Sequence, residues 1–445
     1  MQPASSRISA SFARLRQQPW AWQLGATLAF WGQVRLFTDL RGHYGPLWSP
    51  LWFYLVSVLL CGCALMAQLR ATPAAVPPAL ESRRVLGSWA TVLLGGLAVL
   101  YVQAPVIAGH PIDVLQSDII PILQNYVTRF QSGEVVYRYI TNLPYPLFPN
   151  HLPLQWLPYV VAEQLGVDYR WWALGILLLG GLGAYLAFLN AQRLPLVLFA
   201  GLAVLPWLLL RHLIKVDSGL YAQTVELTII AYYCLLAASI FSRSALVQAT
   251  ALVLCLLSRY SVVFWVPFFL WLLWRERGRC HAVTVAGLTG LGIVLIYVVP
   301  FLSKDWTIFT HALSEYKIAT LGEWSRDNGP GGKPYHLFSG LGFASYFYTF
   351  GGGDIPARIS LLQKAHILAS AGAVALSAGV YWKLRHRLDY RALALISLGF
   401  YLSTFYAFIQ IPYAYLTSLT LFIAVFVLAI AWRQPVSKLP APAQP

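Results

Sequence analysis

The sequence predicts an all-α integral membrane protein, a polytopic helical bundle of about 11–13 transmembrane helices with two large extracytoplasmic loops. Two observations lead to this fold class. Hydrophobic residues make up 58% of the 445 residues and charged residues only 11%, whereas a soluble domain carries about 25% charged residues. Apolar stretches also recur that approach or exceed the roughly 18 residues needed to span a bilayer. Because the backbone inside hydrocarbon must satisfy its own hydrogen bonds, each such stretch is expected to be a helix.

The expected helices of the first half follow from these stretches. Residues 1–18 are polar, and no small-residue cleavage site follows a short apolar core, so 20–37 is interpreted as an uncleaved first helix rather than a signal peptide. Placing the N-terminus in the cytoplasm puts Arg70, Arg83 and Arg84 inside, as the positive-inside rule requires. The next helices are expected over 51–68, 86–105, 171–190, 194–212 and 219–241, which leaves 107–170 as a first outer loop.

Residues 245–274 admit two interpretations. As one long helix, they would place the basic cluster 275–279 outside. As a hairpin of two short helices that turns at Ser258, Arg259 and Tyr260, they place that cluster inside, which the charge rule favours. Each arm of about 14 residues reaches only ~21 Å at about 1.5 Å per residue, so the tip is expected in a cavity or at a locally thinned outer boundary.

The rest of the chain completes the expected bundle. We find no fixed-period repeat and no soluble domain, so residues 1–433 are expected to form one transmembrane domain with both termini in the cytoplasm. The Pro-rich tail 434–445 is expected to be disordered. A helix over 282–302 is followed by a second outer loop over 303–364 and by helices over 366–382, 391–410 and 413–432, with Pro412 as the last turn.

Charge and cysteine content narrow the partners. The net charge is +15, but Lys and Arg cluster in short loops as the positive-inside rule describes, so membrane lipids rather than nucleic acid are the expected partners. Four of the five cysteines lie in apolar helices and one in a basic loop. This pattern predicts neither a disulfide framework nor a metal site.

The first outer loop combines acidic, aromatic and proline residues. Ser117 is placed to cap a helix that starts near Asp118, and apolar residues then recur at helical spacing, which predicts an amphipathic helix in the membrane interface. The aromatic and Pro-rich stretch that follows suits a sugar face or a lipid tail, or else forms a packing belt at headgroup level. The candidate substrate contacts in this loop are Tyr137, Tyr145 and His151.

These features together resemble the GT-C superfamily of membrane glycosyltransferases, in particular its bacterial polyprenyl-phosphate-sugar-dependent mannosyltransferase-like branch. The chain departs from the family at Ile122, where an aromatic residue is common. The features that carry the resemblance lie within about residues 86–275: the long first outer loop, Gly133 and Tyr137, the segment 219–226 with a displaced Gln223, and Arg259 before Pro267 where the family has a Lys-Pro pair.

The resemblance implies that a loop aspartate is the catalytic base or a substrate and metal ligand, with Asp118 the first candidate and Asp113 the second. Transfer from a lipid-phosphate sugar needs a base for the acceptor hydroxyl and cations for the leaving phosphate. Asp118 can alternatively act only as a helix cap, and the cations can merely snorkel to the interface or pair with a buried carboxylate. The candidate phosphate-binding residues are Arg259, Arg211, His212 and Lys215.

The second outer loop adds further candidates. Arg326, Lys333 and His336 flank a Gly/Pro run that can act as the hinge of a gating loop, or be a plain loop. The run is no phosphate loop, because no strand precedes it and no Gly-Lys-Ser/Thr follows. His311 and Glu315 are spaced by four residues, but two ligands do not predict a metal site.

The favoured function is therefore an inverting glycosyltransferase of the bacterial inner membrane. It would transfer a sugar from a polyprenyl-phosphate donor to a lipid or glycan acceptor on the extracytoplasmic face. No cofactor is assigned, and use of a divalent cation is left open. A multi-pass secondary transporter or lipid flippase is the alternative, although no repeated halves are visible. An envelope scaffold without activity is the third hypothesis.

Overall fold

The structure of the protein is a computed structural model that describes residues 18–71, 81–192 and 194–433. The expected disordered tail 434–445 and nearly all of the polar segment 1–18 lie outside the described residues. Within the described ranges the chain is helical, and its β structure is limited to one isolated antiparallel bridge between Ile140 and Leu147.

Seven helical segments are long and apolar enough to cross a membrane, so this is a multi-pass helical membrane protein. At about 1.5 Å per residue, segments of 19 to 30 residues cover the ~30 Å of a bilayer core. They are α3 (Arg41–Arg70), Leu86–Gly109 within α4 (Glu81–Gly109), the continuous rod Tyr169–Asn190 (α8, η2 and α9), α10 (Leu196–Val216), Arg279–Val298 (α15 and η4), α19 (Ile355–Leu384) and α21 (Ala414–Trp432).

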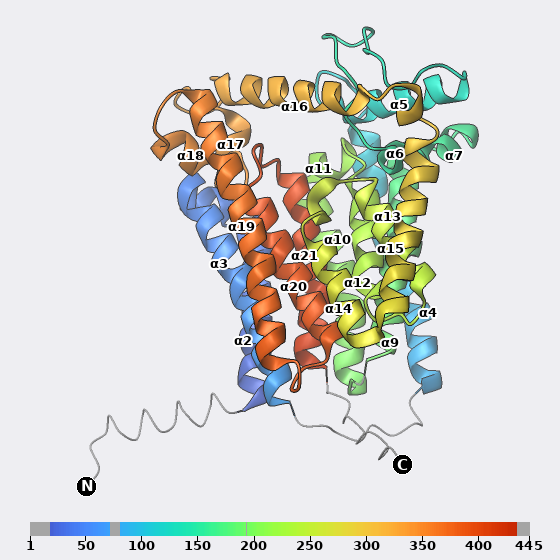
Figure 1. Cartoon of the computed structure of the whole chain (residues 1–445), viewed down its shortest axis with the longest axis vertical. Coiled ribbons are helices and arrows are strands. Elements are labelled where there is room, and N and C mark those ends of the chain that lie inside the picture. The colour runs from blue at the N-terminus through green and yellow to red at the C-terminus, as the bar shows by residue number, and fades with distance from the viewer. Residues whose placement is uncertain (1–17, 72–80, 193, 434–445) are drawn as a thin grey trace.

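Five further helices pack against these segments and fill the bundle (Figure 1). Together with the seven segments above, they give the described residues enough helices for the predicted total of about 11–13 membrane crossings. The exact number that crosses the bilayer stays a prediction. They are α2 (Pro19–Thr38), α12 (Glu226–Ser239), α13 (Ala245–Leu256), α14 (Trp265–Arg277) and α20 (Tyr390–Ala407).

The hairpin predicted over 245–274 is confirmed. The helix is broken between Leu256 and Trp265, apart from a short 3₁₀ turn. The two arms run back on each other, because Arg277 at the end of α14 donates to the backbone carbonyl of Arg243, just before α13, at 3.0 Å. Arg259 therefore lies at the tip of the hairpin, away from the basic cluster.

Both predicted outer loops lie at one end of the bundle, opposite to the start of α2 and the end of α21 (Figure 1). The first loop forms α5 (Ile119–Gln131), α6 (Pro153–Trp156) and α7 (Pro158–Gln164). The second forms α16 (Ile308–Ser325), which runs across this end of the bundle, followed by α17 (Tyr335–Ser339) and α18 (Ala344–Phe350). We call this the outer end; which side of the membrane it faces stays a prediction from charge.

Several expected helix boundaries are wrong, among them the start of α3 at residue 41 rather than 51, and hydrogen bonds explain two others. α19 begins at residue 355 rather than 366, because the Asp354 side chain accepts from the Ala357 N–H at 3.0 Å and starts the helix early. The expected helix 219–241 is divided into α11 (Ser218–Ala222) and α12. At the break, the Gln223 side chain donates to Gln116 of the first outer loop at 2.7 Å, which ties the interruption to that loop.

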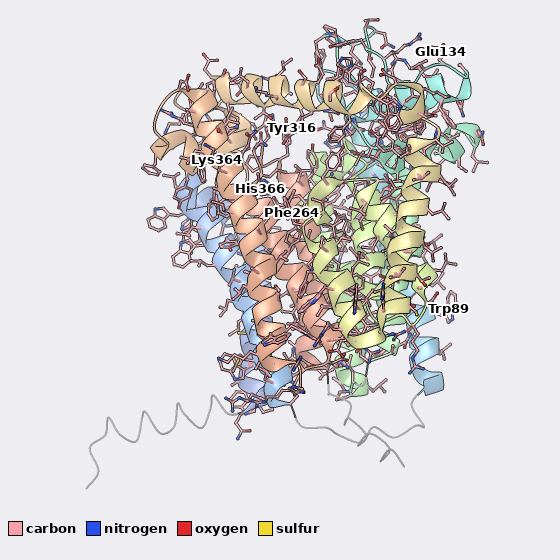
Figure 2. The ribbon with its side chains drawn as sticks, in the orientation of Figure 1. Trp89, Glu134, Phe264, Tyr316, Lys364 and His366 are labelled. Carbon is pink, nitrogen blue, oxygen red and sulfur yellow. The ribbon has the colours of Figure 1, made fainter. Side chains whose placement is uncertain are left out.

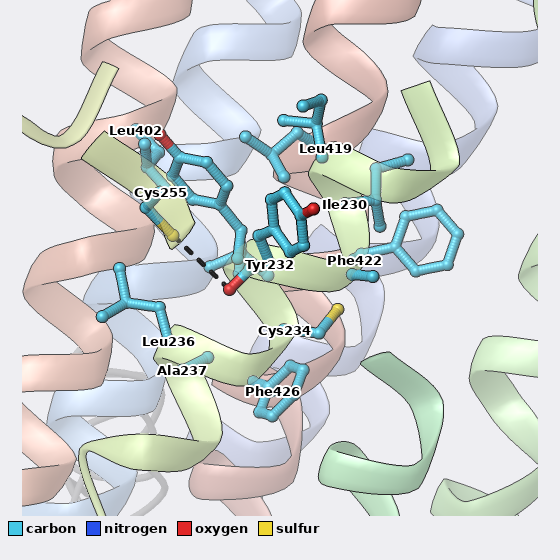
Figure 3. Close-up of a cluster of buried hydrophobic side chains, with 14 of the residues drawn as sticks. Ile230, Tyr232, Cys234, Leu236, Ala237, Cys255, Leu402, Leu419, Phe422 and Phe426 are labelled. Carbon is cyan, nitrogen blue, oxygen red and sulfur yellow. Dashed lines mark hydrogen bonds between the residues drawn. The ribbon is translucent and has the colours of Figure 1, made fainter. Parts of the chain in front are cut away.

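The bundle interior is closely packed around α12 (Figure 3). Cys234 and Cys255 are buried there among aromatic and aliphatic side chains of α12, α20 and α21, and the Cys255 thiol donates to the Tyr232 carbonyl at 3.4 Å. All five cysteines are free thiols, and only Cys280 is exposed. These contacts fit the expectation that the cysteines are structural.

Candidate functional site

The candidate site lies at the outer end, where the first outer loop, α16 and the turn before α21 meet. Asp118 precedes α5, but its carboxylate makes no capping bond to that helix. Instead Asp118 Oδ2 accepts a hydrogen bond from the Tyr145 hydroxyl. The expectation that Ser117 caps α5 is also wrong, because its hydroxyl donates to the Gln223 carbonyl at 3.0 Å. The Asp118 carboxylate therefore bonds to another part of the first outer loop and does not cap its own helix.

Tyr145, which donates to this carboxylate, is also affected by charges of the second outer loop. Burial and the Asp118 carboxylate raise the pKa of Tyr145, and the charges of Arg326 and Glu323 also act on it. Arg326 Nη1 lies 2.6 Å from Glu323 Oε1 in an ion pair. The charges of Asp118 and Arg326, which were predicted separately in the two loops, therefore act on the same tyrosine.

His336, a third predicted residue, belongs to the same cluster. Its Nε2 lies 3.9 Å from Glu323 Oε2, and its ring meets the Tyr413 ring edge-on at 4.7 Å. Burial and Arg326 lower the pKa of His336, and Glu323 opposes them. Tyr413 in turn stacks on Tyr415, with ring centroids 5.4 Å apart. The cluster thus has an aromatic wall contributed by the turn at Pro412.

Arg259 forms a buried ion pair below this cluster. Its Nη1 and Nη2 donate to Glu226 Oε1 and Oε2 at 2.6 and 2.7 Å, and the Glu226 side chain is only 2% exposed. Tyr406 of α20 accepts from Arg259 at 3.5 Å. Of the alternatives for Arg259, pairing with a buried carboxylate is the one found. Its positive charge is therefore largely neutralised before any ligand binds.

His151 and Tyr415 are both affected by the charges of Asp118 and of the ion pair. The charges of Asp118 and Arg259 both act on the His151 ring, and both also act on the Tyr415 hydroxyl at the start of α21. His151 Nδ1 lies 3.0 Å from the Tyr126 hydroxyl. The charges of the carboxylate and of the ion pair therefore both reach the same two side chains. In Figure 2, Tyr316 lies between α16 and the bundle, above Phe264 and His366, so α16 covers this region.

The state of His151 predicts a pH dependence of stability. Burial lowers the pKa of His151 from 6.5 to about 4, so between these values the unfolded chain binds a proton that the folded chain does not. The full free energy of unfolding is therefore kept above the unfolded pKa. It decreases as the pH falls, by about 2 kcal/mol between pH ~7 and pH ~5. We expect His151→Gln to flatten this slope in thermal unfolding of the detergent-solubilised protein. The exposed control His43→Gln should keep the slope; a wild-type slope in His151→Gln would contradict the assignment.

Several predicted residues are used structurally or lie apart. Asp113 Oδ1 accepts from the Leu115 N–H at 2.9 Å in a local turn. Tyr137 is buried and its hydroxyl donates to the His151 carbonyl at 3.0 Å, so it supports the loop rather than lining the cluster. Lys333 Nζ lies 5.1 Å from the centre of the Phe338 ring. Arg211 lines a groove between α4 and α10 instead of facing Asp118, and His212 and Lys215 follow it on the same helix.

Three residues of the site were not among the predicted candidates. Glu323 is the carboxylate that holds both Arg326 and His336, and Tyr413 and Tyr415 supply the aromatic wall. The only sequence signals were the spacing of Glu323 and Arg326, three residues apart at the end of one helix, and a Tyr-x-Tyr sequence after Pro412. Within the described residues no group of three or more His, Cys, Asp or Glu side chains is arranged to hold a metal ion.

The fold and this polar outer end define the class as a multi-pass helical membrane protein with a charged and aromatic cluster beneath a surface helix. Comparisons of the chain with protein-family models, with curated proteins and with solved structures find no match. Any functional assignment therefore depends on the chemistry of the cluster itself.

Proposed function

We propose that the protein is a membrane glycosyltransferase that moves a sugar from a polyprenyl-phosphate donor to a lipid or glycan acceptor at the extracytoplasmic face. The observation that carries the proposal is the placement of the Asp118 carboxylate. It accepts a hydrogen bond from the Tyr145 hydroxyl, on which the charges of Arg326 and Glu323 also act, and Glu323 pairs with Arg326 and lies 3.9 Å from His336. A base and cations at one apolar-walled site are what such a transfer needs.

The proposed step assigns each group a role. The acceptor hydroxyl takes the place of the Tyr145 hydroxyl at Asp118, its oxygen attacks the anomeric carbon, and its proton passes to the Asp118 carboxylate. The bond between the anomeric carbon and the phosphate oxygen breaks, and polyprenyl phosphate leaves. Arg326 stabilises the charge on the leaving phosphate by bidentate hydrogen bonds, because its side chain is 55% exposed and can exchange Glu323 for another anion.

The surroundings of the cluster support a lipid-linked sugar as the substrate. The stacked Tyr413 and Tyr415 rings offer flat apolar faces to a sugar. α16 covers the cluster and leads into the Gly/Pro run, where Gly331 and Gly332 adopt positive φ values of 70° and 66° that other residues rarely adopt. Such a helix and hinge can open for the donor and close to exclude water. No step of the proposed reaction is assigned to a divalent cation.

A transporter is the second candidate, and one specific observation favours it. The Glu226–Arg259 pair lies at the interrupted start of α12 and at the tip of the α13–α14 hairpin. Transporters place charged pairs at such helix breaks within the membrane. The aromatic and charged cluster at the outer end, however, has no role in a simple carrier.

An assay in proteoliposomes separates the two functions. Purified protein would be given a radiolabelled polyprenyl-phosphate sugar on one side of the vesicle and a panel of lipid and glycan acceptors on the other or the same side. The glycosyltransferase proposal expects label in the acceptor together with release of polyprenyl phosphate. Movement of intact donor between leaflets, with no labelled acceptor from any member of the panel, would instead identify a flippase and overturn the proposal.

A further inference from the structure

A groove of about 310 Å³ runs along the side of the bundle between α4 and α10, which pack against each other. Small and apolar side chains line it, among them Leu94, Ala98 and Leu208, and Arg211 is its one charged lining residue. The groove does not touch the cluster around Asp118. It therefore raises a separate question, namely what fills it in a membrane.

Gly95 on α4 allows the hollow to form. The Trp207 ring of α10 lies so close to Gly95 that an added Cβ atom would come within 2.6 Å of the ring. A larger residue at position 95 would push Trp207 outward into the groove. The floor of the groove therefore depends on a glycine and a buried tryptophan facing each other across the two helices.

The groove opens toward lipid. Leu94 and Leu208 on its rim are 66% and 53% exposed, although both belong to membrane-spanning helices. Trp89, next to the lower end of the groove on α4, is 69% exposed and projects from the side of the bundle (Figure 2). The surroundings of the groove are thus hydrocarbon, and a molecule that fills it must carry an apolar chain.

Arg211 places a positive charge in the groove and so favours an occupant with negative charge. It lies five residues before the end of α10 at Val216, about 7.5 Å along the axis. Among the described residues, no hydrogen bond, ion pair or ring contact is made by its side chain. His212 and Lys215 follow on the same helix, and the nearby Asp217 carboxylate accepts from the Leu220 N–H at 3.2 Å as the cap of α11. A cation in this position is costly unless it meets an anion, and a guanidinium binds phosphate oxygens bidentately.

We propose that this groove is a binding site for an anionic phospholipid of the surrounding bilayer. One acyl chain lies along Leu94, Ala98 and Leu208, and the phosphate binds Arg211. The concentration of positive charge at this end of α10 favours a lipid with net negative charge over a zwitterionic one, because the ammonium group of a zwitterionic lipid is repelled. The site is independent of sugar transfer and holds if the protein proves to be a transporter.

The test measures which lipids stay bound. The full-length protein is reconstituted in vesicles of equal amounts of phosphatidylglycerol and phosphatidylcholine with a trace of polyprenyl phosphate, extracted in mild detergent, and analysed by native mass spectrometry. The wild type is expected to retain phosphatidylglycerol about fivefold over phosphatidylcholine. Arg211→Gln should bring that ratio close to one, and Ala98→Leu, which fills the groove at an exposed position, should reduce the retention of both lipids.

A matched control is Val197→Leu, a lipid-facing change on α10 outside the groove, which should behave as the wild type. Equal lipid ratios in the wild type and Arg211→Gln would overturn the proposal. Preferential retention of polyprenyl phosphate would also overturn it, because the groove would then hold the lipid carrier rather than a bilayer phospholipid. Thermal unfolding of each variant verifies that the comparison is made between folded proteins.

Discussion

Asp118→Asn is expected to lower the rate of sugar transfer by about a hundredfold or more, because an amide cannot take the proton of the acceptor hydroxyl. Asparagine is nearly the same size, and the Tyr145 hydroxyl can still donate to its oxygen, so the fold around α5 should be kept. The expected kinetic signature is a loss of kcat with little change in the donor KM, since donor binding depends on the cations and the aromatic wall. The measurement is initial-rate transfer in proteoliposomes.

Two variants make this result interpretable. Asp113→Asn changes the other candidate base, whose carboxylate accepts from the Leu115 N–H in a local turn, and should retain most of the activity. Glu134→Gln removes an exposed carboxylate that pairs only with its neighbour Arg138 on the same loop, and should retain all of it. Full transfer by Asp118→Asn would refute its role as the base. Loss of transfer only in Asp113→Asn would move that role to Asp113.

The arrangement of helices was largely predictable because it follows from local composition. Each apolar stretch became a helix since hydrocarbon leaves the backbone no other hydrogen-bond partner. The hairpin at Arg259 was predictable for a different reason, namely that only two arms place the basic cluster 275–279 at the same end as the other basic loops, as the positive-inside rule requires. The start of α19 was missed because a single capping aspartate, Asp354, extends the helix into a polar segment that hydropathy assigns to a loop.

The site was predictable residue by residue but not as an arrangement. Asp118, Tyr145, Arg326 and His336 were each selected for their chemistry, yet nothing in the local pattern reveals that Tyr145 would bond to Asp118 and respond to the charges of the second outer loop. Arg211 was grouped with the phosphate ligands because it is near the same end in sequence. Its side chain instead faces α4, since helical periodicity at position 211 points it away from the bundle interior.

Breaking the Glu226–Arg259 pair is expected to be the most destabilising single change at the site. Arg259→Ala leaves a carboxylate that is 2% exposed without its counter-ion, which typically costs about 3–5 kcal/mol. The neutral double variant Glu226→Gln with Arg259→Met removes both charges and keeps the side-chain volume, so it should be closer to the wild type than Arg259→Ala alone. Thermal unfolding in one detergent, across wild type, Glu226→Gln, Arg259→Met and the double variant, measures the coupling between the two residues.

The same four proteins also decide what the pair contributes to function. If the pair only holds the hairpin tip against α12 and Tyr406, the double variant should recover both stability and sugar transfer, because packing replaces the charges. If Arg259 instead exchanges Glu226 for the donor phosphate during the reaction, the double variant should be stable and yet transfer slowly, with a raised donor KM. Two stable single variants would contradict the buried pairing itself, because neither charge could then depend on the other for its place inside the bundle.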